Sequence, residues 1–320
     1  MNEPSGEYSV VKLDENRVAD LVYIYKNAFG VEVQADELAS RHLFCHGEHR
    51  FVGFIAYHKT SNEPAAYYGV FPVYAIYQDN RVLVAQSGDT MTHPNHQKKG
   101  LFIQLAKTTY DYCKTIGVEL IFGFPNKNSY PGFIKHLGFT ELAPLVSLTL
   151  LENKFELCRI SSVNKWLSQL HTKYIRMVLR LLAKQGHSFP NSNKNSQPPA
   201  AYILHDELFY RQKDKPDKLF VRINDVNIWL KISENQLEAG DFDSADADRI
   251  HAVIAKLKFI AVVAGCRFLF LGGSSNSFPV SLLREAVQAR ADSYTPIFLN
   301  LSCDIPLDAF SFLHCDVDVF

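Results

Sequence analysis

The chain has 320 residues, of which 47% are hydrophobic and 21% are charged. This composition is ordinary for a folded globular protein, and the length allows two domains that each have a core. The formal net charge of −1 at pH 7 gives no overall basic field that would favour a nucleic acid as partner. The six cysteines contain no C-x-x-C pair, which indicates reduced thiols in a cytoplasmic protein.

Neither the first residues nor the longest apolar run of the sequence predicts insertion into a membrane. The first residues, Met1 to Glu7, are acidic and lack the apolar core of a secretory signal. The longest apolar run, near Ala252 to Cys266, is too short for a span and carries Lys256 and Lys258. We therefore expect a buried helix there and a cytoplasmic location.

The first ninety residues alternate between helical and strand patterns. Tyr8 to Leu13 alternates as a strand, and Asn16 is expected to cap a helix that ends at Gly30. A short helix is predicted at about 35–45. Further strands are predicted at 51–57, 65–77 and 81–91.

A basic loop then separates a strand from a helix at Thr92 to Phe102. The first N–H groups of a helix have no intrahelical partner, and the positive end of the helix dipole favours anions. Gly100 allows phosphates to approach the backbone closely, while Lys98 and Lys99 add positive charge. The loop therefore has the composition of a diphosphate-binding site.

The segments after this loop complete a longer pattern. A helix over 101–116 precedes a strand over 118–124, an Asn-containing turn, and a helix from Asn128 to Gly138-Phe139. This order resembles the GCN5-related N-acetyltransferase (GNAT) family over about residues 5–150. The resemblance implies a mixed α/β (α+β) fold with a mostly antiparallel central sheet flanked by helices, acetyl-coenzyme A binding, and acyl transfer to an amine. Phe102 departs from the family, which usually has Gly or Ala there.

The resemblance also implies where the cofactor lies. The strand residues Met91, Thr92 and His93 would offer backbone groups to the pantetheine arm. The diphosphate would be held by amides of Gln97, Lys98, Lys99, Gly100, Leu101 and Phe102. Asn126, Asn128 and Ser129 would contact the arm from the other side, although capping of the next helix explains that segment equally well.

Two catalytic roles have candidates with open alternatives. Most of the family carries a Tyr as general acid where this chain has Ile134. Tyr130 and His136 are the nearby substitutes, and Tyr130 is preferred because one helical turn can bring it near Ile134; alternatively, Tyr130 only packs under the helix start. Asp89 is a candidate general base, because aspartate is unfavourable inside a strand. The alternative is an aspartate of a β-bulge or turn.

Further acidic and histidine residues are candidates for catalysis and for metal binding. Residues 312–320 alternate as a strand, which predicts Asp316 and Asp318 on one face beside a cation, either an amino substrate or an Arg or Lys of the protein. His42 and His46 lie one turn apart and could chelate zinc, but no second ligand pair has zinc-site spacing. We expect no metal.

The second half contains an echo of the first. With a shift of 148 positions, Gly117 falls on Gly265 and Asn128-Ser129-Tyr130-Pro131 falls on Asn276-Ser277-Phe278-Pro279. Gln97-Lys98-Lys99-Gly100 falls on Ala245-Asp246-Ala247-Asp248, where acidic side chains would repel a diphosphate. We therefore predict a GNAT domain at 1–152, a basic helical insert and linker at 153–200, a degenerate GNAT-like lobe at 201–320, and one cofactor site.

Within the insert, the helix at 166–184 carries a stripe of Arg176, Arg180 and Lys184. It suits peripheral contact with anionic lipid or a lid over a phosphorylated substrate; the alternative is an ordinary amphipathic helix with a solvated face. Residues 190–199 are polar and proline-bounded, as in a linker or surface loop.

These observations predict an acetyl-coenzyme A-dependent N-acetyltransferase in which a substrate amine attacks the thioester directly. The acceptor is expected to be a small-molecule amine, such as an amino sugar or a nucleotide-linked sugar. The alternatives are transfer of an aminoacyl or other acyl group, and a non-catalytic acyl-coenzyme A-binding protein, which the missing Tyr at Ile134 favours.

Overall fold

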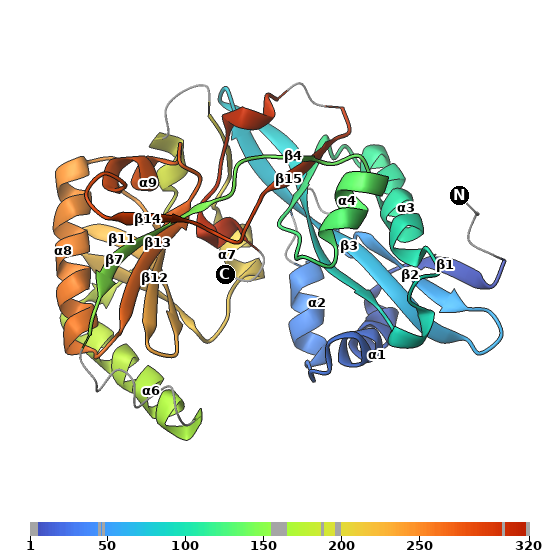
Figure 1. Cartoon of the computed structure of the whole chain (residues 1–320), viewed down its shortest axis with the longest axis horizontal. Helices are drawn as coiled ribbons and strands as arrows, with labels where there is room; N and C mark the ends of the chain where they lie inside the picture. Colours follow the sequence, from blue (N-terminus) through green and yellow to red (C-terminus); the bar gives the residue numbers. More distant parts are fainter. Residues whose placement is uncertain are drawn as a thin grey trace. The chain divides into compact units, whose positions relative to one another are not determined.

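The computed structural model of the protein describes residues 6–43, 46, 49–154, 165–186, 189–195, 200–302 and 305–317. The chain forms two compact units that interleave along the sequence (Figure 1). The first consists of Met1–Leu142, Arg211–Lys213 and Thr295–Asp308. The second consists of Ala143–Tyr210, Asp214–Tyr294 and Ala309–Phe320.

The first unit is built on a sheet with the strand order β1-β2-β3-β4-β5-β15-β6. All neighbours along this path are antiparallel except β4 and β5, which are parallel. The mostly antiparallel sheet was predicted and is confirmed. The strands are β1 Tyr8–Lys12, β2 Gly53–His58, β3 Glu63–Tyr77, β4 Asn80–Thr92, β5 Leu120–Gly123, β15 Ile297–Asn300 and β6 Thr140–Glu141.

Helices pack two separate apolar cores against this sheet. One core joins Leu21, Ile24 and Leu38 of the first helices to Ile55 and Met91 of the strands. The other core contains Leu105, Tyr110 and Phe133 of the later helices together with Tyr68 and Ala85. The helices are η1 Glu15–Arg17, α1 Val18–Phe29, α2 Ala35–Leu43, η3 Pro94–His96, α3 Leu101–Thr115 and α4 Tyr130–His136.

The caps of the first helix differ in part from the prediction. Asp14, and not Asn16, is the capping residue: its carboxylate accepts a hydrogen bond from the Asn16 N–H at 3.0 Å and caps η1, whereas α1 follows Arg17, which makes no side-chain cap hydrogen bond. The predicted end at Gly30 is confirmed, and Gly30 adopts the left-handed conformation with φ 69°.

The second unit has its own sheet, with the order β14-β7-β13-β12-β11-β10-β8. Its one parallel pair is β12 with β13. The strands are β14 Gln288–Ala291, β7 Val146–Glu152, β13 Phe268–Gly273, β12 Gln236–Phe242, β11 Val226–Ser233, β10 Lys218–Ile223 and β8 Lys184–Gln185. The other described elements are α6 Lys165–Leu182, η4 Ser192–Asn195, β9 Ala201–Ile203, α7 Glu207–Gln212, α8 Ala247–Val263, α9 Phe278–Leu283, η5 Leu307–Ala309, β16 Phe310–Ser311 and η6 His314–Asp316.

The second unit repeats the order of the first. The shift of 148 places α3 on α8, β5 on β13 and α4 on α9. Gly117 and Gly265 both adopt left-handed conformations, with φ of 80° and 67°. The apolar run near 252–266 forms α8 as expected, and none of the described helices is long and apolar enough to cross a membrane.

Two strands lie in a different unit from the one that their sequence position suggested. The chain segment of β7, placed by the sequence in the first domain, pairs with β13 and β14 of the second unit. Leu148 and Leu150 of β7 are buried in the second core, which explains this placement. Conversely, β15, from the predicted C-terminal lobe, pairs with β5 and β6 of the first unit.

Candidate active site

The parallel strands of the first sheet separate at their carboxyl ends. They pair only from Val84 with Leu120 to Gln86 with Phe122, after which β5 ends at Gly123 and β4 continues to Thr92. The other edge of β4 stays paired with β3 as far as Thr92. Among the described residues, the β5-side edge of β4 at 87–92 thus has no strand partner. An extended ligand can pair with it as an added strand does.

The edge leads directly into the predicted diphosphate loop. Gln97, Lys98, Lys99 and Gly100 are exposed, and both Lys98 and Gly100 adopt left-handed conformations, with φ of 61° and 77°. Between residues 98 and 104, the first backbone N–H with an acceptor in the described chain is that of Gln104, which donates to the Gly100 carbonyl at 3.1 Å. The start of α3 therefore presents several N–H groups and two cations to an anion.

A half-buried polar cluster holds the start of this loop. Glu63 Oε1 accepts a hydrogen bond from Tyr23 Oη at 2.7 Å, and Glu63 Oε2 accepts one from His96 Nε2 at 3.3 Å. Oε1 also lies 3.8 Å from His93 Nε2. Tyr8 Oη is 2.9 Å from His96 Nδ1. The sequence analysis missed this cluster, although the H-x-x-H spacing of His93 and His96 was a visible signal.

Two groups in the described chain have metal-ligand chemistry, with ligand atoms within 4.8 Å of one another: Glu63, His93 and His96, and His205, Cys315 and Asp316. In the first group, His93 Nδ1 accepts a hydrogen bond from the Asn95 N–H at 3.2 Å. A neutral imidazole then carries its proton on Nε2, and a protonated nitrogen cannot bind a metal. In the second, the two nitrogens of His205 lie 2.6 and 2.7 Å from carboxylates. In both groups the histidine nitrogens are thus engaged in hydrogen bonds or ion pairs within the protein.

The predicted zinc candidates His42 and His46 lie instead among aromatic rings. The ring centroid of His42 is 5.0 Å from that of Phe71, and the centroid of His46 is 5.1 Å from that of Tyr74. Both histidines are buried.

Phe102, the departure from the family pattern, is accommodated by a glycine on the neighbouring helix. A Cβ atom at Gly132 would lie 2.4 Å from Phe102 Cε1, so only glycine leaves room for the ring. The ring centroid of Phe102 is also 5.2 Å from that of Phe133. Leu101, the residue before Phe102 and the first of α3, is buried in the core beneath this helix.

The Asn126 to Ser129 segment has the geometry of a helix cap. Asn126 Oδ1 accepts hydrogen bonds from the N–H groups of Asn128 and Ser129, at 2.9 and 3.1 Å. These bonds favour the capping alternative for this segment. Contact of Asn126, Asn128 and Ser129 with the cofactor stays a prediction.

Asp89 lies at a β-bulge of β4. Gly88 pairs with Gly69 and Met91 with Tyr67, so β4 has one residue more than β3 between these pairs, and Asp89 has φ 51°. Its Oδ1 accepts a hydrogen bond from Arg41 Nη1 at 2.8 Å. The bulge alternative is therefore confirmed for the backbone, while the role of Asp89 as base stays a prediction.

The other oxygen of Asp89 lies beside a neutral histidine. His42 Nε2 is 3.8 Å from Asp89 Oδ2. Burial lowers the pKa of His42 to about 4, so its imidazole is uncharged at neutral pH. Arg41 is thus the cation that holds the Asp89 carboxylate.

Tyr130 has a partner within the first unit. Its hydroxyl donates a hydrogen bond to the carboxylate of Glu141, and this bond raises the pKa of Tyr130 above its usual value. A higher pKa makes the phenol a weaker proton donor to a leaving thiolate. The ring also packs against the core beneath α4, as the alternative reading proposed.

The predicted strand over 312–320 is wrong for its described part, 312–317. Residues 314–316 form the 3-10 helix η6, because Asp316 Oδ2 accepts a hydrogen bond from the Leu313 N–H at 2.7 Å and caps that turn. Asp318 lies outside the described residues. Asp316 is buried, and among the described residues its cationic partner is His205, whose Nε2 is 2.7 Å from Asp316 Oδ1.

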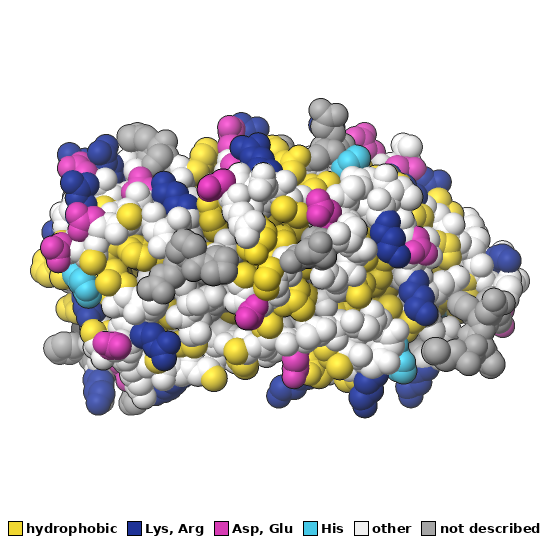
Figure 2. All heavy atoms as spheres, turned by 90° about the horizontal axis from the view of Figure 1, so that it is seen from above, with side chains coloured by type: hydrophobic (Ala, Val, Ile, Leu, Met, Phe, Trp, Pro, Cys, Tyr) yellow, Lys and Arg dark blue, Asp and Glu magenta, His cyan; other side chains and the backbone are white. Residues whose placement is uncertain are grey.

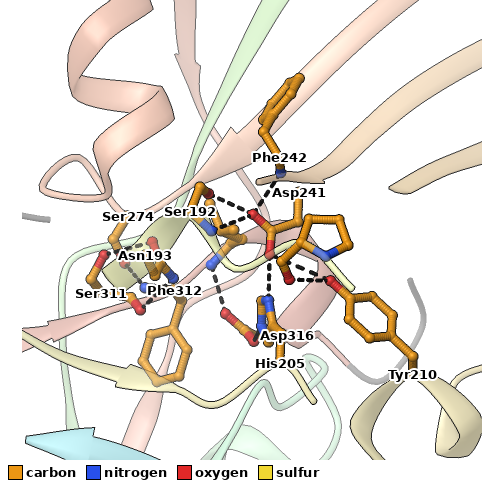
Figure 3. Close-up of polar contacts among 12 residues, drawn as sticks. Ser192, Asn193, His205, Tyr210, Asp241, Phe242, Ser274, Ser311, Phe312 and Asp316 are labelled. Atoms are coloured by element: carbon orange, nitrogen blue, oxygen red, sulfur yellow. Dashed lines mark hydrogen bonds and ion pairs between the residues drawn. The ribbon is translucent and has the colours of Figure 1, made fainter. Parts of the chain in front are cut away.

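His205 is the centre of a buried network in the second unit (Figure 3). Its Nδ1 lies 2.6 Å from Asp241 Oδ2. Burial alone would lower the pKa of His205, but the charge of Asp316 and the hydrogen bonds to both aspartates outweigh burial and raise it to about 9. The network is therefore an imidazolium between two carboxylates, far from solvent.

The same network corrects the prediction of a linker or surface loop at 190–199 for residues 190–195, while 196–199 lie outside the described residues. Ser192 and Asn193 are buried, and the N–H and hydroxyl of Ser192 both donate to Asp241 Oδ1, at 2.9 and 2.5 Å. Asn193 Nδ2 donates to the Ser311 carbonyl at 3.0 Å. A buried carboxylate requires donors, and this polar segment supplies them.

In the second unit, the space between the separating parallel strands is filled by the chain itself. The parallel pairing of β12 and β13 ends at Ala239 and Leu271. Beyond this point Leu313 forms a bridge with Gly273, and the Phe312 carbonyl accepts a hydrogen bond from the Ser274 N–H at 2.7 Å. We call residues 312–317 the C-terminal segment.

His314 fixes the C-terminal segment between the two strands. Its ring lies against Gly272, where a Cβ atom would be 2.1 Å from His314 Cε1. Its Nδ1 is 2.8 Å from Glu238 Oε1, and its Nε2 is 2.9 Å from Asp292 Oδ2. Burial lowers the pKa of His314, but these carboxylates outweigh it and raise the pKa to about 9. A pocket of about 180 Å³ remains beside His314 and Glu238.

The second unit also lacks the long phosphate loop. Eight residues, 93–100, separate β4 from α3, but only four, 243–246, separate β12 from α8. The ungapped match of Gln97-Gly100 to Ala245-Asp248 is therefore wrong. The carboxylate of Asp246 accepts a hydrogen bond from the Arg249 N–H at 3.1 Å and takes the place an anion would have.

A sheet whose parallel strands part beside an anion-binding helix start defines the acyltransferases of the GNAT fold. Residues 9–142 match the family model described as acetyltransferase (GNAT) domain. Residues 9–142 therefore form a GNAT acetyltransferase domain, and the second unit repeats its order of elements without the phosphate loop. No curated protein sequence matches the chain.

Solved structures share the fold across both units. A GCN5-related N-acetyltransferase from Kribbella flavida has 14% identity and a TM-score of 0.60, with 92% of this chain and 71% of that chain covered. One from Anabaena variabilis has 12% identity and a TM-score of 0.55, with 91% and 72% covered. The Saccharomyces cerevisiae N-myristoyltransferase, solved with myristoyl-CoA, has 10% identity and a TM-score of 0.52, with 93% and 80% covered.

Proposed function

We propose that the protein is an acetyl-coenzyme A-dependent N-acetyltransferase whose donor lies in the first unit. The observation that carries this proposal is the edge of β4 at 87–92, which has no strand partner in the described chain and runs into the N–H groups at the start of α3. The myristoyl-CoA bound to the structurally similar N-myristoyltransferase supports a coenzyme A thioester as donor.

Each part of the site has a separate task. The amides after Gln97, together with Lys98 and Lys99, bind the diphosphate, and the β4 edge binds the pantetheine arm. An N–H of β4 near Met91 stabilises the negative charge that develops on the thioester oxygen.

The chemistry is direct acyl transfer. The nitrogen of the acceptor amine forms a bond to the thioester carbon, the carbon–sulfur bond breaks, and coenzyme A leaves as a thiolate. The proton lost by the amine goes to Asp89 or to water. Because a thiolate is a good leaving group and water can protonate it, the site can operate with Ile134 in place of the family Tyr and with Tyr130 bonded to Glu141.

For the acceptor we propose an amino sugar or a nucleotide-linked sugar, since a second unit and a basic helix suit an acceptor larger than a free amino acid. Transfer of a longer acyl or aminoacyl group would need a wider channel beside Phe102, whose ring is seated on Gly132. A panel of amino sugars, nucleotide sugars and peptides, assayed by thiol release, distinguishes these acceptors. Coenzyme A binding without thiol release across the panel would support the non-catalytic alternative.

The first prediction concerns the charge of the loop. Lys98→Glu with Lys99→Glu should raise the Kd for coenzyme A by about tenfold or more, because two attractions to the diphosphate become repulsions. Isothermal titration calorimetry measures this change and should also show one site per wild-type chain, because the C-terminal segment fills the second unit. The matched control is Lys107→Glu with Lys114→Glu, two exposed lysines of helix α3, which follows the loop. An unchanged Kd in the loop variant would place the donor elsewhere.

A further inference from the structure

Helix α6 has a second apolar face, whose described side chains are exposed. Ile175, Val178 and Leu179 are buried in the core of the second unit. Away from that face, five large apolar side chains recur at intervals of three or four residues and so form one narrow stripe. They are Trp166, Leu170, Tyr174, Met177 and Leu181, with exposed fractions of 64, 43, 42, 50 and 74%.

The stripe continues onto the end of α8. Tyr174 Oη donates a hydrogen bond to the Val263 carbonyl at 3.1 Å, which places the two helices in contact at this point. Phe259, Val262 and Val263 of α8 are also exposed. We call the stripe and these three residues the α6–α8 surface. Contiguous exposed apolar surfaces of this kind mark interaction sites.

The charges carried by the two helix segments that form this surface all have one sign. Residues 165–186 and 252–265 contain no Asp or Glu. Lys173, Arg180 and Lys184 are exposed beside the stripe, and Lys256 Nζ lies 5.1 Å from the centroid of the Phe259 ring. By contrast, the face of the molecule in Figure 2 mixes Lys and Arg with Asp and Glu.

This combination selects one kind of partner. A second copy of the surface would bring like charges together, and a nucleic acid would gain nothing from the apolar stripe. A membrane with anionic headgroups satisfies both features, because an interfacial helix buries its apolar side at the acyl boundary while Lys and Arg reach the headgroups. We infer that the α6–α8 surface docks the protein on anionic lipid surfaces.

The two tryptophans of the chain allow a direct measurement. Trp229 is 1% exposed and Trp166 is 64% exposed, so a change in emission on binding reports on Trp166. The full chain is titrated with vesicles of phosphatidylcholine alone and of phosphatidylcholine with phosphatidylglycerol. We expect a blue shift and co-sedimentation with the anionic vesicles, both reduced by high salt. Trp166→Phe should keep the sedimentation and lose the shift.

Surface variants test which features carry the binding. Leu170→Glu with Leu181→Glu should reduce vesicle binding by about tenfold or more, and Lys173→Gln with Arg180→Gln by about fivefold per cation removed. The control is Phe29→Glu with Val31→Glu, an exposed apolar pair of the first unit, which should bind as the wild type does. All changes are at exposed positions, and thermal unfolding checks that each variant is folded.

Three results would overturn the inference. The first is absence of binding to anionic vesicles at low salt, and the second is equal binding by the stripe variant and the wild type. The third is self-association of the wild type in sedimentation velocity that Leu170→Glu with Leu181→Glu abolishes, which would assign the surface to a second copy. None of these readouts uses coenzyme A, so they are independent of the proposed activity.

Discussion

Asp89 shows how a single residue in an unusual position can indicate a function. An aspartate inside a strand is disfavoured, and the structure explains it by a bulge and by Arg41, which binds its Oδ1 at 2.8 Å. This explanation gives Asp89 a structural role. An experiment must therefore separate that structural role from a role as general base.

For Asp89→Asn we expect kcat to fall by about a hundredfold and its dependence on pH to change, because an amide cannot accept the proton of the amine. The control is Arg41→Gln, which removes the same ion pair and keeps the carboxylate. The measurement is kcat against pH for both variants. A profile of Asp89→Asn that matches the wild type rules out this residue as base, and equal losses in both variants make it a positioning residue.

His205 supports a stability prediction. Its imidazolium lies between Asp241 and Asp316, and all three side chains are buried. His205→Ala leaves two carboxylates without their cation, which should lower the free energy of unfolding by about 3–5 kcal/mol. Denaturant unfolding measures the change, with the exposed His251→Ala as control.

The same residue predicts how stability depends on pH. The pKa of His205 rises from 6.5 to about 9 on folding, so the folded state binds its proton more tightly than the unfolded chain. The stabilisation is complete below pH 6.5 and is lost as the pH rises through 9. His314 acts in the same direction. The wild type should lose stability over this window, and His205→Ala should lose less; equal slopes would contradict the assignment.

At the scale of elements, the regular patterns were readable and the irregular ones were not. Periodicity and turn residues located α1, α3, β3 and β4 to within a few residues, because these elements depend on local alternation of apolar and polar side chains. The same kind of alternation gave a wrong prediction for 312–317. Burial around this segment depends on hydrogen bonds to residues more than a hundred positions away in the sequence. The Glu63 cluster was missed for a similar reason, since His96 lies 33 positions from Glu63.

The C-terminal segment allows a stability test at the scale of elements. In Gly272→Ala the new Cβ would lie about 2 Å from the His314 ring and would displace it from Glu238 and Asp292. We expect a loss of about 1–3 kcal/mol in the free energy of unfolding, as for overpacked cores. Gly6→Ala is the control, because nothing lies within 4 Å of its Cβ position. Equal stability of the two variants would mean that the segment does not depend on the ring seated there.

At the scale of the whole molecule, the sequence revealed two lobes but not how the chain is divided between them. The echo between the halves located α8, β13 and α9. The echo could not assign β7 or β15 to a unit. The pairing partner of such a short strand depends on contacts with the sheet that it joins, and these contacts are distant in sequence. The fold was therefore predictable, whereas the unit boundaries depended on contacts distant in sequence.

The exchange of β15 has a consequence for how the protein is made. This strand lies between β5 and β6, so the catalytic sheet stays open at that point until residue 300 has left the ribosome. During synthesis of the intervening residues, β5 would present an unprotected edge on which other nascent chains could add a strand. Chaperone occupancy of the partly translated polypeptide should accordingly persist long after the coenzyme-binding loop has emerged.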